Sequence, residues 1–424
     1  MGLYSHFLVL CLFSVSSVIC QVTEFISIDC GGTSNYTDPI TGLAWISDNG
    51  TIMKYGKSSE AQISNGNMQY QRRRDFPIDS NKYCYTLGTK ERRRYLVRAT
   101  FQYGSLENED AYPKFDLYLD TTRWSTVVVL EAARVYVKEM IIRAPSSSID
   151  RWQPESNFGA LSKDVIRYPD DPYDRIWDSD LAKRQNYLVG VAPGTVRINT
   201  SKHVDTRTRE YPPVKVMQTA VVGTEGMLSY RLNLEDFPAN ARAFAYFAEI
   251  QDLGGNETRK FKLQQPYSPD YSNAVVNIAE NANGSYTLYE PSYMNVSLDF
   301  ILSFSFVKTR DSTLGPLINA IEISKYLKIE QKTDSKDVTV LNALRSLSAE
   351  SASANEQGDP CVPAHWEWVN CTSTKPPRIT KIALSGKNLK GEIPPEINNL
   401  EQLTELWLDG KLPYRVISCY KQSS

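Results

Sequence analysis

The stretch KFDLYLD, Lys114–Asp120, alternates apolar side chains with charged or polar ones. A period of two is typical of a β-strand with one face in a core and the other in water. Similar short strands are expected at 95–101, 126–130 and 133–142, separated by clusters of Gly, Asn, Asp and Pro. This pattern predicts an antiparallel β-sandwich in the first part of the chain.

The same pattern returns between residues 157 and 329, and it predicts a second β-sandwich. The expected strands are 242–250, 260–263, 285–288, 299–307 and 317–323. A weak internal repeat links the two regions, because Asp-Pro precedes Trp and Ser-Asp in both. The matching residues are Asp38-Pro39, Trp45 and Ser47-Asp48 in the first region, and Asp171-Pro172, Trp177 and Ser179-Asp180 in the second. We therefore expect two related lobes in tandem.

The chain changes character after residue 335. Apolar residues at three- and four-residue spacing between 338 and 347 predict a short amphipathic helix, followed by a polar linker at 351–358. A Trp-rich loop between Cys361 and Cys371 comes next. Ile379 and Leu403 then begin two similar apolar patterns 24 residues apart, which is a leucine-rich-repeat period. The pattern is lost after Gly410, so the tail at 411–424 is expected to be frayed.

Bulk composition favours a globular, exported chain. The 424 residues are 41% hydrophobic and 23% charged with a net charge of −2, which points neither to nucleic acid nor to an anionic membrane. The first twenty residues contain a short apolar run ending near Cys20, as in a cleaved secretory signal peptide. No later run reaches the length of about 18 apolar residues needed for a membrane span. The mature chain is expected to be secreted and soluble.

Sequons and cysteines agree with export. Seven Asn-x-Ser/Thr sequons predict N-glycosylation, at Asn35, Asn49, Asn199, Asn256, Asn283, Asn295 and Asn370. After removal of the signal, five cysteines remain: Cys30, Cys84, Cys361, Cys371 and Cys419. An odd number leaves at least one thiol without an intramolecular partner, and Cys419 in the tail is the first candidate.

No catalytic motif appears in the sequence. His203 and His365 are the only histidines outside the signal region, and neither has a flanking nucleophile signature. Asp170, Asp171, Asp174, Asp178 and Asp180 could pair for glycoside hydrolysis, but a turn with capping acids is the simpler interpretation. No Cys/His cluster has metal-ligand spacing. We therefore expect no enzyme activity, no cofactor and no metal.

Aromatic and basic residues supply the candidate binding positions. Four aromatic residues lie in loops where their faces could hold a sugar: Tyr36, Trp45, Tyr173 and Trp177. Trp45 and Trp177 occupy equivalent positions in the two lobes, which favours core packing for both. Tyr36 and Tyr173 remain as ligand-binding candidates. Two basic runs, 72–74 and 92–94, could bind an acidic polymer or peptide, but solvated charge at a sheet edge is the preferred interpretation.

Several long motifs identify a family resemblance. They are IDCGGTSNYTDPITGLAWISD, YCYTL, YLVRATFQYG, YPDDPYDRIWDSD, STLGPLINAIEI and GDPCVPAHWEWVNC followed by LSGKNLKGEIPPEI. From about Phe25 to Gly410 the chain resembles plant leucine-rich-repeat receptor kinases with a malectin-like ectodomain, of the symbiosis-receptor-like group. The resemblance implies a mainly β fold, with two tandem malectin-like β-sandwich (jelly-roll) lobes and a short α/β leucine-rich-repeat stub.

The expected organisation follows from that resemblance. It comprises a signal peptide (1–20), lobe 1 (24–150), lobe 2 (157–330), a helix and linker (335–358), a repeat cap with incomplete repeats (359–410) and an aberrant tail (411–424). Cys361 and Cys371 are expected to form the disulfide that caps the repeats. Cys30 and Cys84 can pair with each other, but sequence does not assign them. In the relatives, the motif Gly358-Asp359-Pro360-Cys361 governs release of the malectin-like region, and Asp-Pro at a domain junction also predicts a turn.

The chain also departs from the family pattern. It ends inside the repeats, and no Gly-rich loop, His-Arg-Asp or Asp-Phe-Gly kinase motif is present. Lobe 1 also lacks a closing segment, because residues 146–150 run directly into residues of lobe 2. Loss of that strand should leave unpaired backbone at a sheet edge.

We expect a non-catalytic extracellular ligand-recognition region of a plant receptor-like Ser/Thr kinase. Its expected ligands are a cell-wall glycan, a peptide or the ectodomain of another receptor kinase, and no nucleic acid. The expected location is the secretory pathway and the apoplast, with the full-length relatives at the plasma membrane. The alternative is a truncated isoform that has no ligand of its own and modulates full-length receptors, or a fragment of a membrane receptor kinase.

Overall fold

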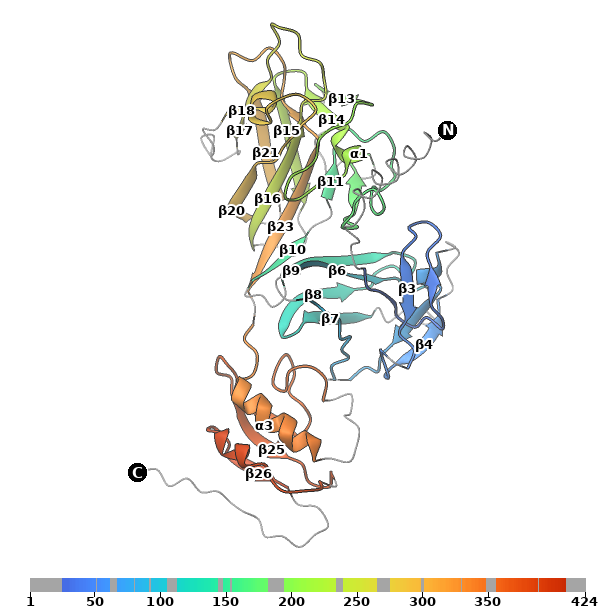
Figure 1. Cartoon of the computed structure of the whole chain (residues 1–424), viewed down its shortest axis with the longest axis vertical. Coiled ribbons are helices and arrows are strands. Elements are labelled where there is room, and N and C mark those ends of the chain that lie inside the picture. The colour runs from blue at the N-terminus through green and yellow to red at the C-terminus, as the bar shows by residue number, and fades with distance from the viewer. Residues whose placement is uncertain are drawn as a thin grey trace, which may run out of the picture.

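Three parts lie along the longest axis of the computed structural model, and the part that comes first in the sequence lies between the other two (Figure 1). We call residues 25–143 lobe 1, residues 155–328 lobe 2 and residues 335–408 the cap. The structure describes residues 25–50, 52–61, 67–79, 81–90, 93–104, 113–143, 148–152, 155–181, 194–233, 239–264, 275–298, 301–328, 330–347, 356–387 and 389–408. The expected signal peptide and tail, including Cys419, lie outside these ranges.

Lobe 1 is built from strands in several small sheets, and its two long strands β6 and β9 belong to a larger sheet. The strands are β1 (Ser27–Asp29), β2 (Tyr36–Thr37), β3 (Ala44–Ser47), β4 (Lys57–Glu60), β5 (Arg72–Asp75), β6 (Arg94–Phe101), β7 (Lys114–Leu119), β8 (Thr122–Val128) and β9 (Tyr136–Arg143), with a 3-10 turn at Met68–Tyr70. The expected strand at Lys114 is confirmed as β7, which pairs antiparallel with β8. Leu117 and Leu119 pack against buried Trp124 and Met140, which form a small core.

Lobe 2 is larger and has a more extensive core. Its elements are β11 (Glu155–Asn157), β12 (Trp177–Ser179), β13 (Thr195–Asn199), α1 (Val214–Met217), β14 (Thr219–Gly223), β15 (Met227–Asn233), β16 (Ala239–Ala248), β17 (Lys260–Gln264), β18 (Val275–Asn277), α2 (Ile278–Asn281), β19 (Leu288–Tyr289), β20 (Ser292–Leu298), β21 (Ile301–Lys308), β22 (Leu317–Ile318) and β23 (Ala320–Lys328). Facing sheets bury aromatic side chains between them, among them Tyr230, Phe247, Phe261 and Phe306. The lobe is thus a β-sandwich, as expected.

The two lobes share one continuous sheet. β10 (Ser148–Trp152) pairs with β9 of lobe 1 on one side and with β23 of lobe 2 on the other. The resulting order is β12-β11-β23-β10-β9-β6, and β16 joins it through β23. The prediction of an unpaired sheet edge in lobe 1 is therefore wrong, because residues 148–152 supply backbone partners for β9. Figure 1 shows β9, β10 and β23 meeting where the lobes join.

A repeated structural motif confirms that the lobes are related. β1 pairs in parallel with β3, so that Ser27 lies opposite Trp45, and β11 pairs in parallel with β12, so that Glu155 lies opposite Trp177. In lobe 1 the Gly31 amide donates to Asp48 at 2.9 Å. In lobe 2 the corresponding amide of Gly159 donates to Asp180 at 3.0 Å.

Each of these aspartates is also paired with an arginine of its own lobe. Arg74 Nε lies 2.6 Å from Asp48, and Arg197 Nη1 lies 2.8 Å from Asp180. The basic run at 72–74 is therefore not simply solvated edge charge, since the Arg74 side chain is buried in an ion pair. A buried charge needs such a partner to remain ionised.

The cap joins a helix to the first repeat strands. α3 (Ser335–Ser346) is capped by Asp334, whose side chain accepts a hydrogen bond from the Lys336 amide. The strands are β24 (Val369–Cys371), β25 (Ile379–Ala383) and β26 (Glu405–Trp407), with a 3-10 turn at Pro395–Asn399. β25 and β26 are parallel, and Ile382 pairs with Leu406, which confirms the 24-residue period. Val340, Leu341 and Leu344 of α3 pack against the Trp-rich loop.

The cysteines divide between the cap and lobe 1. Cys361 and Cys371 form a disulfide in the cap. Cys30 and Cys84 are free thiols, so the suggested pairing of these two is wrong. The physical reason is that the two thiols face different parts of the molecule. Tyr85 bonds to Asp48 beside Cys30, whereas Cys84 faces the cap at Gly358.

Candidate interlobe binding site

A polar network crosses the boundary between the lobes. Arg94 at the start of β6 forms two hydrogen bonds to Glu210 of lobe 2, at 3.3 and 3.0 Å. Further along β6, Arg98 bonds to Glu139 of β9 at 2.5 Å and to the carboxylate of Asp174 in lobe 2 at 2.6 Å. Because β6 places both arginines on the sheet that the lobes share, the strand connects lobe 1 to two loops of lobe 2. We call the loops 165–177 and 205–213, together with Arg94 and Arg98, the interlobe site.

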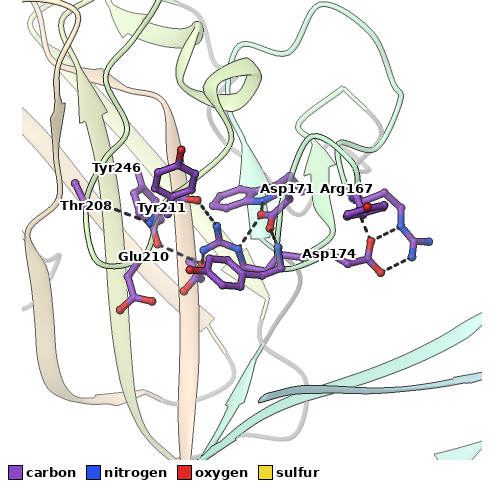
Figure 2. A network of polar contacts seen from close by, with 12 residues as sticks. Arg167, Asp171, Asp174, Thr208, Glu210, Tyr211 and Tyr246 are labelled. Carbon is purple, nitrogen blue, oxygen red and sulfur yellow. Dashed lines mark hydrogen bonds and ion pairs between the residues drawn. The ribbon is translucent and has the colours of Figure 1, made fainter. Parts of the chain in front are cut away.

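Asp174 is the centre of one half of the site. It has a left-handed backbone (φ 56°), and its carboxylate accepts two hydrogen bonds from Arg167, at 2.8 and 2.6 Å (Figure 2). Burial disfavours its ionised form, but the bond from Arg167 and the charge of Arg98 outweigh burial and lower the pKa of Asp174. Asp174 is therefore held as a carboxylate shared by two arginines.

Arg175 is the centre of the other half. Its buried guanidinium bonds to Asp171 at 2.8 Å, to Glu322 at 3.2 Å and to the carbonyl of Tyr211 at 2.9 Å. Figure 2 shows Asp171, Tyr211 and Tyr246 in the polar network on this side of the site. Burial raises the pKa of Glu322 to about 8, although the charge of Arg175 acts to lower it, and nearby Glu210 adds to the rise. The core of the site thus holds a carboxyl group that retains its proton near neutral pH.

Aromatic groups lie where this network reaches the surface. Tyr173 and Tyr211 are both exposed, at 40% and 42%. The guanidinium carbon of Arg175 lies 5.5 Å from the centre of the Tyr173 ring. Tyrosines beside arginines are the groups most often found at the energetic centres of protein interfaces. The arrangement offers a rigid surface for binding.

The two tyrosines expected to bind ligand lie apart in the fold. Tyr173 belongs to the interlobe site. Tyr36 lies in β2 of lobe 1, stacked on Trp45 with ring centroids 6.2 Å apart and an interplanar angle of 5°. The core role expected for the Trp pair is confirmed for Trp177, which is fully buried and donates to Asp171 at 2.6 Å. Trp45 is only half-buried. A ligand-binding role for Tyr36 stays a prediction.

The acidic cluster is structural in most of its members. Asp171, Asp174 and Asp180 are buried and accept hydrogen bonds from arginines or from backbone amides. Asp170 is paired with Lys215 at 2.7 Å. Asp178 also has interactions in the described structure. His203 and His365 are exposed and lie in lobe 2 and the cap, respectively. In the described ranges, no group of three His, Cys, Asp or Glu residues could hold a metal ion.

The expected glycosylation sites have the exposure that modification requires. Asn35, Asn49, Asn199, Asn256, Asn283 and Asn370 are all exposed, whereas the side chain of Asn295 lies outside the described part. Asn199 also lines a cavity of about 290 Å³ beside α1 and β14 of lobe 2. Occupancy of the sequons stays a prediction.

The motif Gly358-Asp359-Pro360-Cys361 forms a joint between the cap and lobe 1. The Asp359 carboxylate accepts from the amides of Thr333 and Cys361, both at 2.9 Å, which fixes the turn. Lys82 of lobe 1 donates to the carbonyl oxygens of Asp359 and Ala364, at 2.6 and 2.5 Å. The motif is thus a junction of three segments, and its role in release stays a prediction.

Sequence reasoning missed the arginines and glutamates that join the lobes. Arg94 belongs to the basic run at 92–94, which the sequence suggested was solvated edge charge, and Glu210 carried no motif. The only signal was the basic run itself.

No helix in the described part of the chain is long and apolar enough to cross a membrane.

Comparison with known proteins defines the class. A family model described as the malectin-like domain matches residues 28–151 and 149–326. These matches cover most of the chain, which therefore belongs to the malectin-like domain family.

Curated relatives narrow the resemblance further. An Arabidopsis thaliana protein described as a probable LRR receptor-like serine/threonine-protein kinase is 65% identical over 438 residues, covering 95% of this chain and 47% of that relative. A leucine-rich repeat receptor-like serine/threonine-protein kinase of the same plant is 31% identical over 444 residues, covering 93% and 49%. The chain therefore spans about half the length of these relatives. The first alignment is longer than the 424-residue chain, so that relative has residues within the matched interval that lack a counterpart here.

Solved structures agree on the fold. The ANXUR2 extracellular domain from Arabidopsis thaliana has a TM-score of 0.56 at 13% identity, covering 71% of this chain and 96% of that chain. A structure of the plant peptide RALF23 in complex with FER and LLG2 has a TM-score of 0.53 at 16% identity, covering 72% and 95%. At these identities the likeness shows the fold alone.

Proposed function

We propose that this chain is the extracellular ligand-recognition region of a receptor-like Ser/Thr kinase, and that its interlobe site binds a peptide presented alone or with a partner ectodomain. The proposal includes no catalysis by this chain. The observation that carries it is the set of Tyr173, Tyr211 and Arg94 at the surface where two rigidly joined lobes meet. Surfaces of this composition and rigidity are typical of protein recognition.

Two comparisons support this proposal. The relatives named above are receptor-like kinases, and this chain aligns with about half of their length. The structural neighbour FER was solved in complex with the peptide RALF23 and with LLG2. Both point to peptide and receptor partners rather than to a small-molecule substrate. A glycan ligand has no comparable support.

The experiment that tests this proposal selects peptide binders without assuming the identity of the ligand. The secreted, glycosylated chain would be immobilised and used to select binders from a displayed library of random twelve-residue peptides, with RALF23 and LLG2 included as individual probes. We expect saturable binding of at least one peptide, weakened by Tyr173→Ser and unchanged by Arg123→Gln. Arg123 is a suitable control because its ion pair with Asp116 is exposed and lies on the β7–β8 hairpin.

Three results would contradict the proposal. One is a folded, monodisperse chain that selects no peptide and binds neither RALF23 nor LLG2. A second is peptide binding that Tyr173→Ser leaves unchanged. The third is saturable binding to neutral wall oligosaccharides alone. The first result would favour the alternative in which the chain modulates full-length receptors without a ligand of its own.

A further inference from the structure

We propose that the interlobe site recognises an acidic segment of its peptide partner. This inference rests on the proposed function and adds the chemistry of the ligand to it. The basic side chains of the site face the solvent more than their acidic partners do. The whole chain has a net charge of −2, so a local cationic surface does not follow from its composition.

Several ion pairs of the site are partly exposed. In each of them the basic side chain is more exposed than the acidic one. The Arg94 side chain is 42% exposed and its partner Glu210 only 5%. The Arg167 side chain is 31% exposed and its partner Asp174 only 9%. The carboxylates therefore hold the arginines from below, while the guanidinium groups form the surface. An approaching partner meets positive charge first.

The difference in exposure between the basic and the acidic side chain is largest for Arg209 and Glu210. The Arg209 side chain is 76% exposed, and its closest acidic contact is Glu210, at 3.8 Å. That separation is too long for a hydrogen bond, so the donors of Arg209 remain available in the described structure. Arg93, next to Arg94, is also exposed. Asp170 and Asp205 are partly exposed acids of the site, and each is paired with a more exposed base, Lys215 and Arg207 respectively. Free guanidinium donors bind carboxylates in a bidentate geometry.

The two tyrosines favour a peptide over another anion. Tyr173 and Tyr211 are exposed next to the arginines, and Arg175 fixes both by contacting the Tyr173 ring and the Tyr211 carbonyl. An acidic peptide can pack aliphatic or aromatic side chains on these rings while its carboxylates reach Arg94 and Arg209. An acidic glycan shares the carboxylate chemistry but has no aliphatic or aromatic side chains to pack on these rings.

The same library selection tests the charge of the partner. We expect the enriched peptides to carry a net negative charge, and binding to weaken when their Asp and Glu are replaced by Asn and Gln. Fluorescence anisotropy on the most enriched peptide should show roughly five- to tenfold weaker binding to the Arg93→Gln/Arg209→Gln double variant. Both side chains are exposed, so these changes should leave the fold intact. Arg123→Gln should change the affinity less than about twofold.

Each other outcome overturns the inference. Neutral or basic enriched peptides that still require Tyr173 would refute the acidic partner and leave the proposed function standing. Acidic peptides whose binding ignores the Arg93→Gln/Arg209→Gln change would refute the assigned surface. Binding of a galacturonic acid decamer that depends on Arg209, without enrichment of any acidic peptide, would reassign the surface to a glycan. Selection of no peptide, with no binding of RALF23 or LLG2, would refute both proposals.

Discussion

Arg94 and Glu210 are 116 residues apart in the sequence and belong to different lobes, yet their side chains form a two-point ion pair at 3.3 and 3.0 Å. A bidentate arginine–carboxylate pair fixes an orientation as well as a distance. Together with the strand β10 shared by both lobes, this pair holds the two lobes as one body. The interlobe site is therefore a preformed surface.

The first prediction concerns this ion pair. Arg94→Gln leaves the buried Glu210 without its main partner and should cost about 1–3 kcal/mol, a range reduced from that of a fully buried pair because Arg94 is partly exposed. Chemical denaturation of Arg94→Gln, Glu210→Gln and the double variant would give the coupling energy. The exposed Arg123–Asp116 pair, treated in the same way, should give less than about 1 kcal/mol. Equal coupling in the two pairs would contradict the interlobe role.

A second prediction tests the motif repeated in both lobes. A Cβ at Gly159 would lie 2.2 Å from the carbonyl oxygen of Ala220, and one at Gly31 would lie 2.4 Å from that of Arg73. Gly159→Ala and Gly31→Ala should each destabilise their lobe by about 3 kcal/mol or more. Gly42→Ala has a similar positive φ but open space around it, so it should cost only about 1 kcal/mol. Thermal unfolding would compare the three variants, and similar costs at all three positions would rule out the close approach.

Much of the fold could be predicted from side-chain periodicity, and little of the site could. The alternation at 114–120 and the 24-residue spacing after Ile379 are local patterns, and both became the expected strands. β10 was missed because its partner β23 lies far along the chain, and residues 148–152 have no strong pattern of their own. Arg94 and Glu210 look like ordinary surface charges in sequence. Only the tertiary fold brings them together.

The third prediction is a pH dependence. The pKa of Glu322 is raised to about 8 in the folded chain, from an ordinary value of 4.5. Between these values the folded state binds more protons than the unfolded state, so this group's stabilisation is complete below about pH 4.5 and is lost as pH rises towards 8. The slope from one proton is at most about 1.4 kcal/mol per pH unit. Glu322→Gln mimics the protonated carboxyl.

Denaturation of the wild type and Glu322→Gln between pH 5 and 8.5 would measure this effect. We expect the wild type to lose stability relative to the variant as pH rises, with the difference largest near pH 8. Parallel pH profiles for the two proteins would show that Glu322 does not carry a raised pKa. Glu322→Ala is a poorer choice, because it would also remove the partner of Arg175 and Tyr246.

The fourth prediction concerns the joint between lobe 1 and the cap. Lys82→Met removes the ammonium group that donates to Asp359 and Ala364, and should speed amide exchange across residues 358–366. Lys332→Met is the matched control, since both side chains of the Lys332–Asp120 ion pair are exposed and the pair lies close to the same joint. Hydrogen–deuterium exchange of both variants would decide the matter. Unchanged exchange in Lys82→Met would mean that the cap is held by its other contacts.

The central claim is that the surface between the lobes is the binding surface. Hydrogen–deuterium exchange on the secreted chain, with and without the most enriched library peptide, tests it most directly. We predict protection at 167–175 and 207–212 and at the start of β6, with little change in the cap. Protection confined to the cap, to β7 and β8, or to the outer end of lobe 2 would contradict the claim.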